Sequence, residues 1–533
     1  MNQFQENPMF NGAILIGANE RQGGETFYAI NPATGEKGDV AFSSAMPAEV
    51  EEAAKLADAA FDSFSTLVPD ARATFLETVA DNIVAIGDLL IETAMAESGL
   101  PRARLEGERG RTVGQLRLFA SYVRLGDWFD ATIDPAMPDR APMPRADLRR
   151  VNHSVGPVAV FGASNFPLAF SVAGGDTASA FAAGSPVIVK GHSAHPGTGE
   201  LVARAIQAAV KACGLHEGVF SYLPGANRAL GGALIADPRV KAVGFTGSRG
   251  GGVALMKIAA ERNEPIPVYA EMSSINPVVL LPGALAERAE AMGTAFVGSL
   301  TMGSGQFCTN PGLVIALDGP DLDKFVAAAA QAMSGAQPQV MLTPGIHEAY
   351  EKGVAALSGA DGVTTVARGT EAEGCNRGQA AFFATDSATF GANPLLAEEV
   401  FGSSSVLIKC SSIEEVIATI AGLEGQLTAT LQLTEADNAD AAKLLPVLSR
   451  KVGRILTNGW PTGVEVTHAM VHGGPFPSTA DGRSTSVGTL AMMRFLRPVC
   501  YQDVPDALLP AALQDANPLG LTRRVDGKLV AAA

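Results

Sequence analysis

The chain contains 533 residues, of which 47% are hydrophobic and 18% are charged. This composition is too apolar and too weakly charged for a largely disordered protein, and domains of about 150 residues predict several folded units. The 39 lysine and arginine residues against 55 aspartate and glutamate residues give a net charge of −16, which disfavours nucleic-acid binding. A nucleotide cofactor is still compatible with this net charge, because a helix N-terminus with a few basic residues can hold a phosphate.

The cysteines and the apolar stretches indicate the compartment. The five cysteines lie far apart with no Cys-x-x-Cys pair, which fits neither a disulfide framework nor a zinc ribbon and favours a reducing compartment. The first 22 residues lack the basic region and long apolar run of a signal peptide. Glycines and prolines interrupt the most apolar stretch, residues 155–189, so we expect buried strands and turns there rather than a membrane span. These features predict a cytoplasmic protein.

Helices dominate the first part of the chain, and strands alternate with helices after it. Apolar residues recur at helical spacing through residues 48–98, and Gly99 is expected to cap the last of these helices. Strand-like runs then follow at 155–162, 185–190, 219–225, 241–248 and 267–272, with helical stretches between them. A second block has strand-like runs at 276–283, 312–317, 404–410 and 453–459. Such alternation predicts parallel α/β sheets.

This order of elements predicts two parallel-sheet α/β lobes. We expect the first unit at 1–274, with an arm segment near 135–155, and the second at 275–475. Residues 476–533 are expected to return to the first lobe and to end in an oligomerisation segment. The tail from Arg494 carries apolar residues outside either pattern, so it packs either on a partner subunit or on its own chain.

Four segments place reactive or polar residues at the ends of predicted elements. Cys308 lies among glycine, glutamine and asparagine, although a single cysteine is more often inert than nucleophilic. Glu271 ends a predicted strand, where it is either a general base or a structural carboxylate. Asn165 also follows a strand and either stabilises an oxyanion or closes a turn. The glycines of 244–252 allow a phosphate to approach the backbone, but the segment lacks both the GxGxxG and the P-loop pattern.

Together and in this order, the segments resemble the aldehyde dehydrogenase superfamily across essentially the whole chain. The matching motifs are SNFP (164–167), VK (189–190), GFTGS (244–248), EMSS (271–274), GQFC (305–308) and EEVFG (398–402). The resemblance implies a Rossmann-like cofactor lobe, a catalytic lobe, an oligomerisation arm, and a homodimer or homotetramer. It also implies a small-molecule aldehyde as substrate.

The resemblance implies catalytic roles for three residues. Cys308 would attack the aldehyde carbon, and the Asn165 side chain would stabilise the resulting oxyanion together with the Cys308 N–H. Glu271 would activate the water that hydrolyses the thioester. A redox-silent cysteine hydrolase or a binding protein on the same scaffold are the alternatives. The joint presence of these residues with Lys190 and Glu399 favours the dehydrogenase.

The resemblance also implies a nicotinamide dinucleotide site. Ser193 stands where NAD-preferring members commonly carry a glutamate that repels a 2′-phosphate, so we expect NADP, with NAD also accepted. Lys190 at the adenosine ribose and Arg228 supply cations nearby, unless Arg228 is a solvent-facing helix residue. The remaining matching positions are Phe245, Thr246, Gly247 and Ser248 around the pyrophosphate and nicotinamide, and Glu399 and Phe401 at the nicotinamide ribose and ring.

Finer features resemble the 2,5-dioxovalerate (α-ketoglutaric semialdehyde) dehydrogenase branch, in which 2,5-dioxovalerate is oxidised to 2-oxoglutarate. The segments that carry this resemblance are 173–202 and 473–502, and Ser403, which follows EEVFG where proline is usual, indicates a subgroup of the family. Medium-chain or long-chain aldehydes are the alternative substrates. Arg111 is the candidate partner for a substrate carboxylate. Its alternatives are a surface salt bridge with a nearby glutamate, Glu106 or Glu108, or replacement in this role by Arg109 or Arg483.

The histidine pair His468 and His472 was considered as a metal site. The two residues are four apart and would share one face of a helix, but Gly473, Gly474 and Pro475 predict a loop. We therefore expect no metal.

Overall fold

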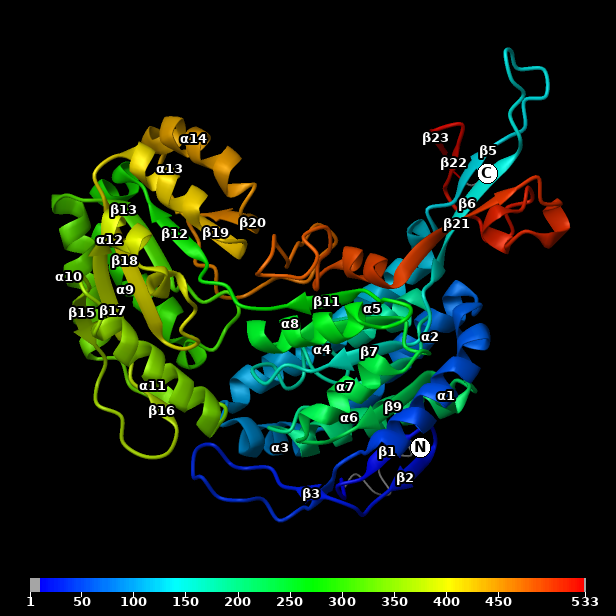
Figure 1. The fold of residues 1–533 in the computed structure, drawn as a ribbon, viewed down its shortest axis with the longest axis horizontal. Helices are drawn as coiled ribbons and strands as arrows, with labels where there is room; N and C mark the ends of the chain where they lie inside the picture. The colour runs from blue at the N-terminus through cyan, green and yellow to red at the C-terminus, as the bar shows by residue number, and fades with distance from the viewer. Residues whose placement is uncertain (1–9, 532–533) are drawn as a thin grey trace.

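The computed structural model describes residues 10–531, so the outermost ends of the first and last predicted units lie outside the described residues. Figure 1 shows two α/β lobes and an arm that projects from the first lobe. The α/β class with parallel sheets and helices is confirmed. Among the described helices, none combines the length and the apolar character needed to cross a membrane.

The predicted helical section of the N-terminal part is confirmed as three helices, followed by a fourth. They are α1 (Pro47–Ser65), α2 (Pro69–Ala85), α3 (Asp88–Ser98) and α4 (Arg102–Leu125). Proline opens α1 and α2, at the position where a helix needs no backbone N–H. Gly99 ends α3 with φ of 67°, in the left-handed conformation that glycine adopts without a steric penalty.

The first lobe is built on a seven-stranded sheet in the order β11-β10-β7-β8-β9-β1-β2. Its five predicted strands are present and parallel: β7 (Val158–Phe161), β8 (Val187–Lys190), β9 (Phe220–Leu223), β10 (Ala242–Thr246) and β11 (Val268–Glu271). The antiparallel hairpin β1 (Ile14–Ile16) and β2 (Asn19–Arg21), which we did not predict, extends the β9 edge. The crossover helices are α5 (Gly175–Ala183), α6 (Pro196–Ala212), α7 (Arg228–Ala236) and α8 (Arg249–Ala260).

Both faces of this sheet are covered, which explains why its strands are continuous apolar runs. Val158 and Val160 of β7 face a core shared with α2, α4, α5 and α6. Ala159 and Phe161 face the opposite core, shared with α1, α7 and α8. Alternate residues of one strand therefore contact two different layers of helices.

The second lobe contains another seven-stranded sheet, in the order β15-β17-β18-β13-β12-β19-β20. The four strands that we predicted are β12 (Pro277–Leu280), β13 (Leu313–Leu317), β18 (Ser404–Cys410) and β20 (Val452–Thr457). The others are β15 (Thr364–Arg368), β17 (Ala381–Asp386) and β19 (Gln426–Gln432). Helices α9 (Pro282–Thr301) and α10 (Pro320–Ser334) cover one face, and α11 (Pro344–Ser358), α13 (Ile413–Gly422) and α14 (Asn438–Leu448) cover the other.

The arm is a five-stranded sheet in the order β21-β6-β5-β22-β23. Its strands are β5 (Thr132–Asp134), β6 (Leu148–Ser154), β21 (Leu496–Gln502), β22 (Arg523–Val525) and β23 (Lys528–Val530). The tail thus packs on its own chain, since β21 pairs with β6 and Leu513 is fully buried in the arm. Leu508 nevertheless keeps 73% of its surface exposed.

The remaining short elements join these parts. They are β3 (Thr26–Phe27), β4 (Phe42–Ser43), β14 (Gln339–Val340), β16 (Arg377–Gly378) and α12 (Ser387–Ala392). Residues 458–488, which we call the return segment, run from β20 back to the first lobe without an α-helix or a strand, as the glycines and proline near His472 predicted.

Candidate active site

The candidate site lies at the carboxyl ends of the first-lobe strands, where they meet a loop of the second lobe. Asn165 follows β7, Lys190 ends β8 and Glu271 ends β11. Parallel strands bring their carboxyl ends to one edge, which is where α/β proteins commonly bind ligands. Cys308 reaches this edge from the second lobe, through the loop between α9 and β13. The site therefore needs both lobes.

The loop that carries Cys308 is held in an unusual backbone conformation. Gly303, Ser304 and Gly305 all have φ between 56° and 66°. A side chain at Gly305 would place its Cβ 2.3 Å from the carbonyl carbon of Gly402, so this loop packs directly against the 398–402 segment. The Asn276 side chain donates a hydrogen bond of 2.9 Å to the Cys308 carbonyl. These contacts fix where the cysteine points.

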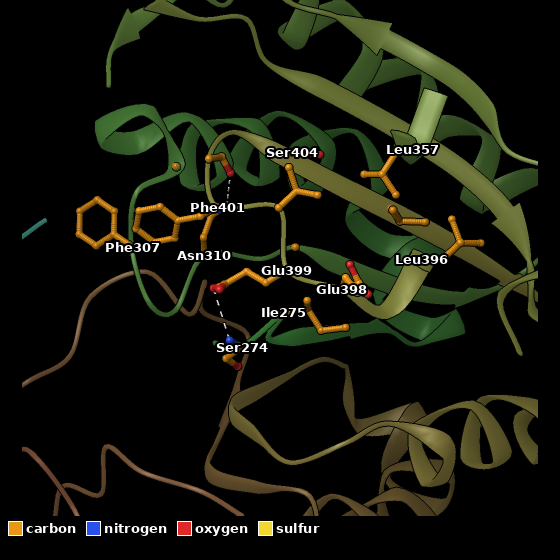
Figure 2. A pocket seen from close by; sticks show the side chains of 15 residues that line it. Ser274, Ile275, Phe307, Asn310, Leu357, Leu396, Glu398, Glu399, Phe401 and Ser404 are labelled. Carbon is orange, nitrogen blue, oxygen red and sulfur yellow. Dashed lines mark hydrogen bonds between the residues drawn. The ribbon is translucent and has the colours of Figure 1, made fainter. Parts of the chain in front are cut away.

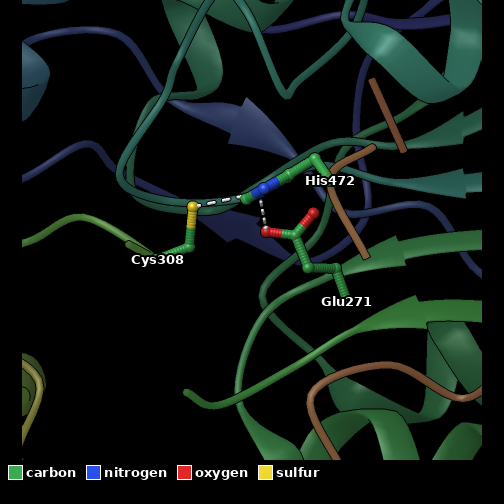
Figure 3. A group of neighbouring side chains, drawn as sticks. All are labelled: Glu271, Cys308 and His472. Atoms are coloured by element: carbon green, nitrogen blue, oxygen red, sulfur yellow. Dashed lines mark hydrogen bonds and ion pairs between the residues drawn. The ribbon is translucent and has the colours of Figure 1, made fainter. Parts of the chain in front are cut away.

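Three side chains meet at the centre of the site, as Figure 3 shows. The Sγ atom of Cys308 lies 3.3 Å from Nε2 of His472, and this Nε2 lies 2.9 Å from Oε1 of Glu271. Ser486 donates a hydrogen bond of 2.6 Å to the second oxygen, Oε2, of Glu271. The carboxylate is 4% exposed and the imidazole 1%. Glu271 therefore has a partner at each oxygen.

These surroundings shift the two reactive groups in opposite directions. Burial tends to raise the pKa of Glu271, but His472 and Ser486 outweigh it and leave this pKa below its usual value. Burial raises the pKa of the Cys308 thiol well above its usual value, and the neighbouring Glu271 carboxylate raises it further. Arg111 acts in the opposite sense on the thiol. The carboxylate is thus ionised at neutral pH, and the thiol needs help to ionise.

Two groups near Cys308 are suited to hold an oxyanion. The Asn165 amide donates one hydrogen bond of 3.1 Å to the Gln306 carbonyl, which leaves its second N–H free to donate. Among the described residues, no acceptor is assigned to the Cys308 N–H. Arg104 donates to the Asn165 carbonyl at 3.3 Å and so anchors this segment to α4. Within the described part of the chain, two N–H groups beside the 306–308 segment therefore have no assigned acceptor.

Arg111 lies on α4, beside the same site. Its Nε and Nη2 are buried and have no hydrogen-bond partner among the described residues. The guanidinium lies 5.2 Å from the centre of the Phe170 ring. Neither predicted salt-bridge partner pairs with it, because Glu106 pairs with Arg102 and Glu108 with Arg104. Burial lowers the pKa of Arg111.

The alternative arginines have other surroundings. Arg109 donates to the Gly87 carbonyl at 3.0 Å, and Arg483 pairs with Asp481 while its side chain is 91% exposed. Both are therefore engaged elsewhere.

The predicted cofactor residues cluster along the edge of the first sheet. Burial lowers the pKa of Lys190 to about 8, and no carboxylate within the described residues pairs with it. Ser193 lies partly exposed in the connection from β8 to α6, while Arg228 is exposed in the first turn of α7. Ser248 caps α8 by accepting a hydrogen bond from the Gly251 N–H. Phe245, Thr246 and Gly247 lead from the end of β10 to this cap.

Glu399 and Phe401 line a cavity at the second lobe, shown in Figure 2. Glu399 accepts a hydrogen bond of 3.3 Å from the Ser274 N–H, on the chain that joins the two lobes. Burial raises the pKa of Glu399 to about 7. Phe307, next to the cysteine, lines the same cavity. The cavity therefore adjoins the reactive site.

The sequence analysis missed His472 and Ser486. It weighed His472 only as a metal ligand beside His468, whose Nδ1 lies 3.3 Å from the Thr489 hydroxyl. The donor atoms of Cys308, Glu271 and His472 do lie within 4.8 Å of one another, close enough to meet around an ion. The expectation of no metal stays a prediction. A histidine and a serine in a loop carry no periodic signal, so only the folded chain brings them to Glu271.

Comparisons with known proteins give a consistent result. The model of the aldehyde dehydrogenase family matches residues 19–495. Alpha-ketoglutaric semialdehyde dehydrogenase 2 of Azospirillum brasilense is 58% identical over 519 residues, which cover 97% of this chain and 99% of that protein. Alpha-ketoglutaric semialdehyde dehydrogenase of Acinetobacter baylyi is 48% identical over 505 residues, 95% of this chain and 96% of that protein.

A similar fold is found among solved structures. The structure of an aldehyde dehydrogenase C mutant from Pseudomonas syringae, in complex with NAD+ and octanal, has a TM-score of 0.79 and 20% identity. The match covers 93% of this chain and 97% of that one.

Proposed function

This chain belongs to the aldehyde dehydrogenase family, and on that basis we propose that it oxidises 2,5-dioxovalerate to 2-oxoglutarate. Two relatives that span nearly the whole chain carry the name alpha-ketoglutaric semialdehyde dehydrogenase, and this semialdehyde is 2,5-dioxovalerate. Enzymes of this family are oxidoreductases, so the general reaction is the oxidation of an aldehyde.

The observation that carries the substrate proposal is the unpaired guanidinium of Arg111. Its buried Nε and Nη2 have no partner among the described residues, and its charge opposes the rise in the pKa of the Cys308 thiol. A buried cation without a partner is costly, and a carboxylate is its best partner. A substrate with an aldehyde at one end and a carboxylate at the other satisfies Arg111 while its aldehyde meets Cys308. A long apolar aldehyde leaves the cation unpaired.

In the proposed reaction, the Cys308 thiolate attacks the aldehyde carbon and forms a carbon–sulfur bond. The carbonyl oxygen becomes an oxyanion, which the Asn165 amide and the Cys308 N–H stabilise. An oxidised nicotinamide held beside Glu399 and Phe401 would supply the acceptor for the aldehyde hydrogen as a hydride, and the acyl group on Cys308 would then be a thioester. Glu271 then takes a proton from water, the hydroxide attacks the thioester, and the sulfur departs as thiolate.

The residues at the first-sheet edge fit a nicotinamide dinucleotide. Lys190 is a half-buried cation with a lowered pKa, and the α8 N-terminus offers N–H groups for a pyrophosphate. Gly247 has no room for a side chain, since its Cβ would lie 2.7 Å from the Phe245 ring. We assign Thr246 and Ser248 to the same part of the cofactor. Glu399 and Phe401, on the cavity wall, are assigned to the nicotinamide ribose and ring.

We propose NADP as the preferred cofactor, with NAD also accepted. Ser193 places a neutral hydroxyl after β8, where a carboxylate would repel a 2′-phosphate. Lys190 and the exposed Arg228 supply positive charge at the same edge of the sheet. An arginine binds phosphate through paired hydrogen bonds, and an exposed one can turn toward it.

The arrangement supports three further proposals. The division at 274/275 fits the change of sheet between Glu271 at the end of β11 and Pro277 at the start of β12.

The exposed strand β23 and Leu508 favour an arm that joins subunits into a homodimer or homotetramer. The five cysteines are free thiols, which fits the reducing cytoplasm.

The test measures cofactor reduction by the purified protein with each cofactor. The aldehydes are 2,5-dioxovalerate, succinic semialdehyde, propanal and a long-chain aldehyde. We expect the highest kcat/KM for 2,5-dioxovalerate with NADP, and no turnover in Cys308→Ala. A preference for the long-chain aldehyde would overturn the substrate proposal. Turnover by Cys308→Ala close to that of the wild type would overturn the role of the cysteine.

A further inference from the structure

We propose that His472 is a positioning residue whose Nε2–H is shared between the Glu271 carboxylate and the Cys308 thiolate. The inference rests on the proposed function only in taking Cys308 as the nucleophile. The inference gives His472 a role that its sequence context did not predict.

The position of His472 is fixed by its backbone. Its N–H donates a hydrogen bond of 2.8 Å to the Thr485 hydroxyl, and its carbonyl accepts one of 2.8 Å from the Ser486 N–H. The next turn of the return segment pairs with β11, because the Met272 N–H donates to the Ser478 carbonyl at 2.8 Å. The imidazole is therefore fixed to the same strand that carries Glu271.

The surroundings of the ring identify the nitrogen that carries the proton. Nδ1 of His472 is buried and has no hydrogen-bond partner within the described part of the chain. Nε2 faces Oε1 of Glu271 at 2.9 Å and therefore carries the proton as a donor.

The same N–H reaches the sulfur atom. Cys308 Sγ lies 3.3 Å from Nε2, within hydrogen-bonding range for sulfur. Once the thiol has released its proton to solvent, the thiolate is a stronger acceptor and draws this N–H toward itself. This donor opposes the burial and the negative charge of Glu271, both of which disfavour the thiolate.

The shared donor also positions the general base. Glu271 Oε1 accepts from His472 while Oε2 accepts from Ser486, so both oxygens are held beside the sulfur atom. When the N–H turns toward the thiolate, Oε1 loses one partner and becomes more basic. His472 thus links the formation of the thiolate to the readiness of Glu271 to take a proton.

The test is the rate at which iodoacetamide alkylates Cys308 in the cofactor-free protein at neutral pH. Peptide mass spectrometry distinguishes Cys308 from the other four cysteines. His472→Phe removes the donor but keeps a ring, whereas His472→Gln keeps an N–H near the position of Nε2. His468→Gln, on the same segment, is the matched control. A chelator is present in a parallel set.

We expect His472→Phe to slow alkylation of Cys308 by about ten- to a hundredfold, the effect of one hydrogen bond to a charged group. His472→Gln should restore most of the rate, and His468→Gln should leave it unchanged. Steady-state kinetics should show a lower kcat in His472→Phe with little change in the KM for cofactor. If His472→Phe does not fold, His472→Met provides the same comparison.

Three results would overturn the inference. One is alkylation of His472→Phe at the wild-type rate. Another is an equal loss in the Phe and Gln variants when both keep the wild-type thermal stability. The third is a wild-type rate that rises when chelator is added, since a metal ion would then hold the three side chains together. Alkylation needs no aldehyde, so a failure of the substrate proposal would leave this result standing.

Discussion

The surroundings of Cys308 disfavour the thiolate that its proposed reaction needs. Burial and the Glu271 carboxylate raise the pKa of its thiol, although attack on a carbonyl needs the thiolate. Arg111 and the His472 N–H are two nearby groups that favour the charged form, and Arg104 and Arg454 also interact with its charge. The motifs of the sequence predicted Cys308, Glu271 and Asn165 as catalytic residues. These motifs gave no sign of the histidine between the first two, because His472 is 164 positions from Cys308.

This conflict predicts a pH dependence for the cofactor-free protein. Because the thiol pKa lies above the usual value, the thiolate is a minor form at neutral pH, and its fraction rises with pH. We expect the alkylation rate of Cys308 to rise about tenfold per pH unit between about pH 7 and 9. The exposed Cys375 and Cys500 are internal controls in the same digest. A rate that levels off below about pH 8 would contradict the raised pKa.

Arg111 gives a prediction about substrate recognition. Arg111→Leu should raise the KM for 2,5-dioxovalerate about ten- to a hundredfold, because a charge-assisted hydrogen bond is lost. The KM for propanal, which has no carboxylate, should change little. Arg109→Leu, two positions away on α4, is the control, since Arg109 bonds the Gly87 carbonyl instead. An equal rise for both aldehydes would show that Arg111 supports the fold rather than the carboxylate.

The helices and strands were predicted correctly where apolar residues recur with a clear period in the sequence. The buried strands β7 to β11 are continuous apolar runs, and the helices between them show an apolar face. The hairpin of β1 and β2 was missed, since its second strand is fully exposed and three residues long. The return segment has no regular element over 458–488, so its pairing with β11 follows only from the folded chain.

The connection from β8 to α6 gives a prediction about cofactor choice. Ser193→Glu should raise the KM for NADP more than about tenfold, because a carboxylate there would repel the 2′-phosphate. The KM for NAD should stay similar or fall, since a carboxylate can accept a hydrogen bond from the ribose hydroxyl. Ser193→Gln, with the same length and no charge, is the control. If Ser193→Glu and Ser193→Gln raise the KM for NADP equally, then the size of the side chain rather than its charge determines the cofactor preference.

At the scale of the whole molecule, the site exists only where the two lobes meet. Asn165 and Glu271 come from the first lobe, Cys308 comes from the second, and His472 and Ser486 come from the segment between them. The order of elements was enough to predict the two parallel sheets. Periodicity could not show how they face each other, because that depends on contacts such as Gly305 against Gly402.

The arm belongs to the same scale. The sequence left open whether the apolar tail packs on its own chain, and pairing of β21 with β6 over seven residues answers this. Leu508 and β23 are still exposed, so they are available for the proposed subunit interface.

In the proposed reaction, Cys308 carries an acyl group made from 2,5-dioxovalerate, which Glu271 helps to release. The most direct test mixes Glu271→Gln with 2,5-dioxovalerate and NADP, stops the reaction in acid, and analyses the peptides by mass spectrometry. Without the Glu271 carboxylate, hydrolysis of the thioester slows. We therefore expect one 2-oxoglutaryl group on the Cys308 peptide and a matching amount of reduced cofactor. Reduced cofactor without an adduct, or an adduct on another residue, would contradict it.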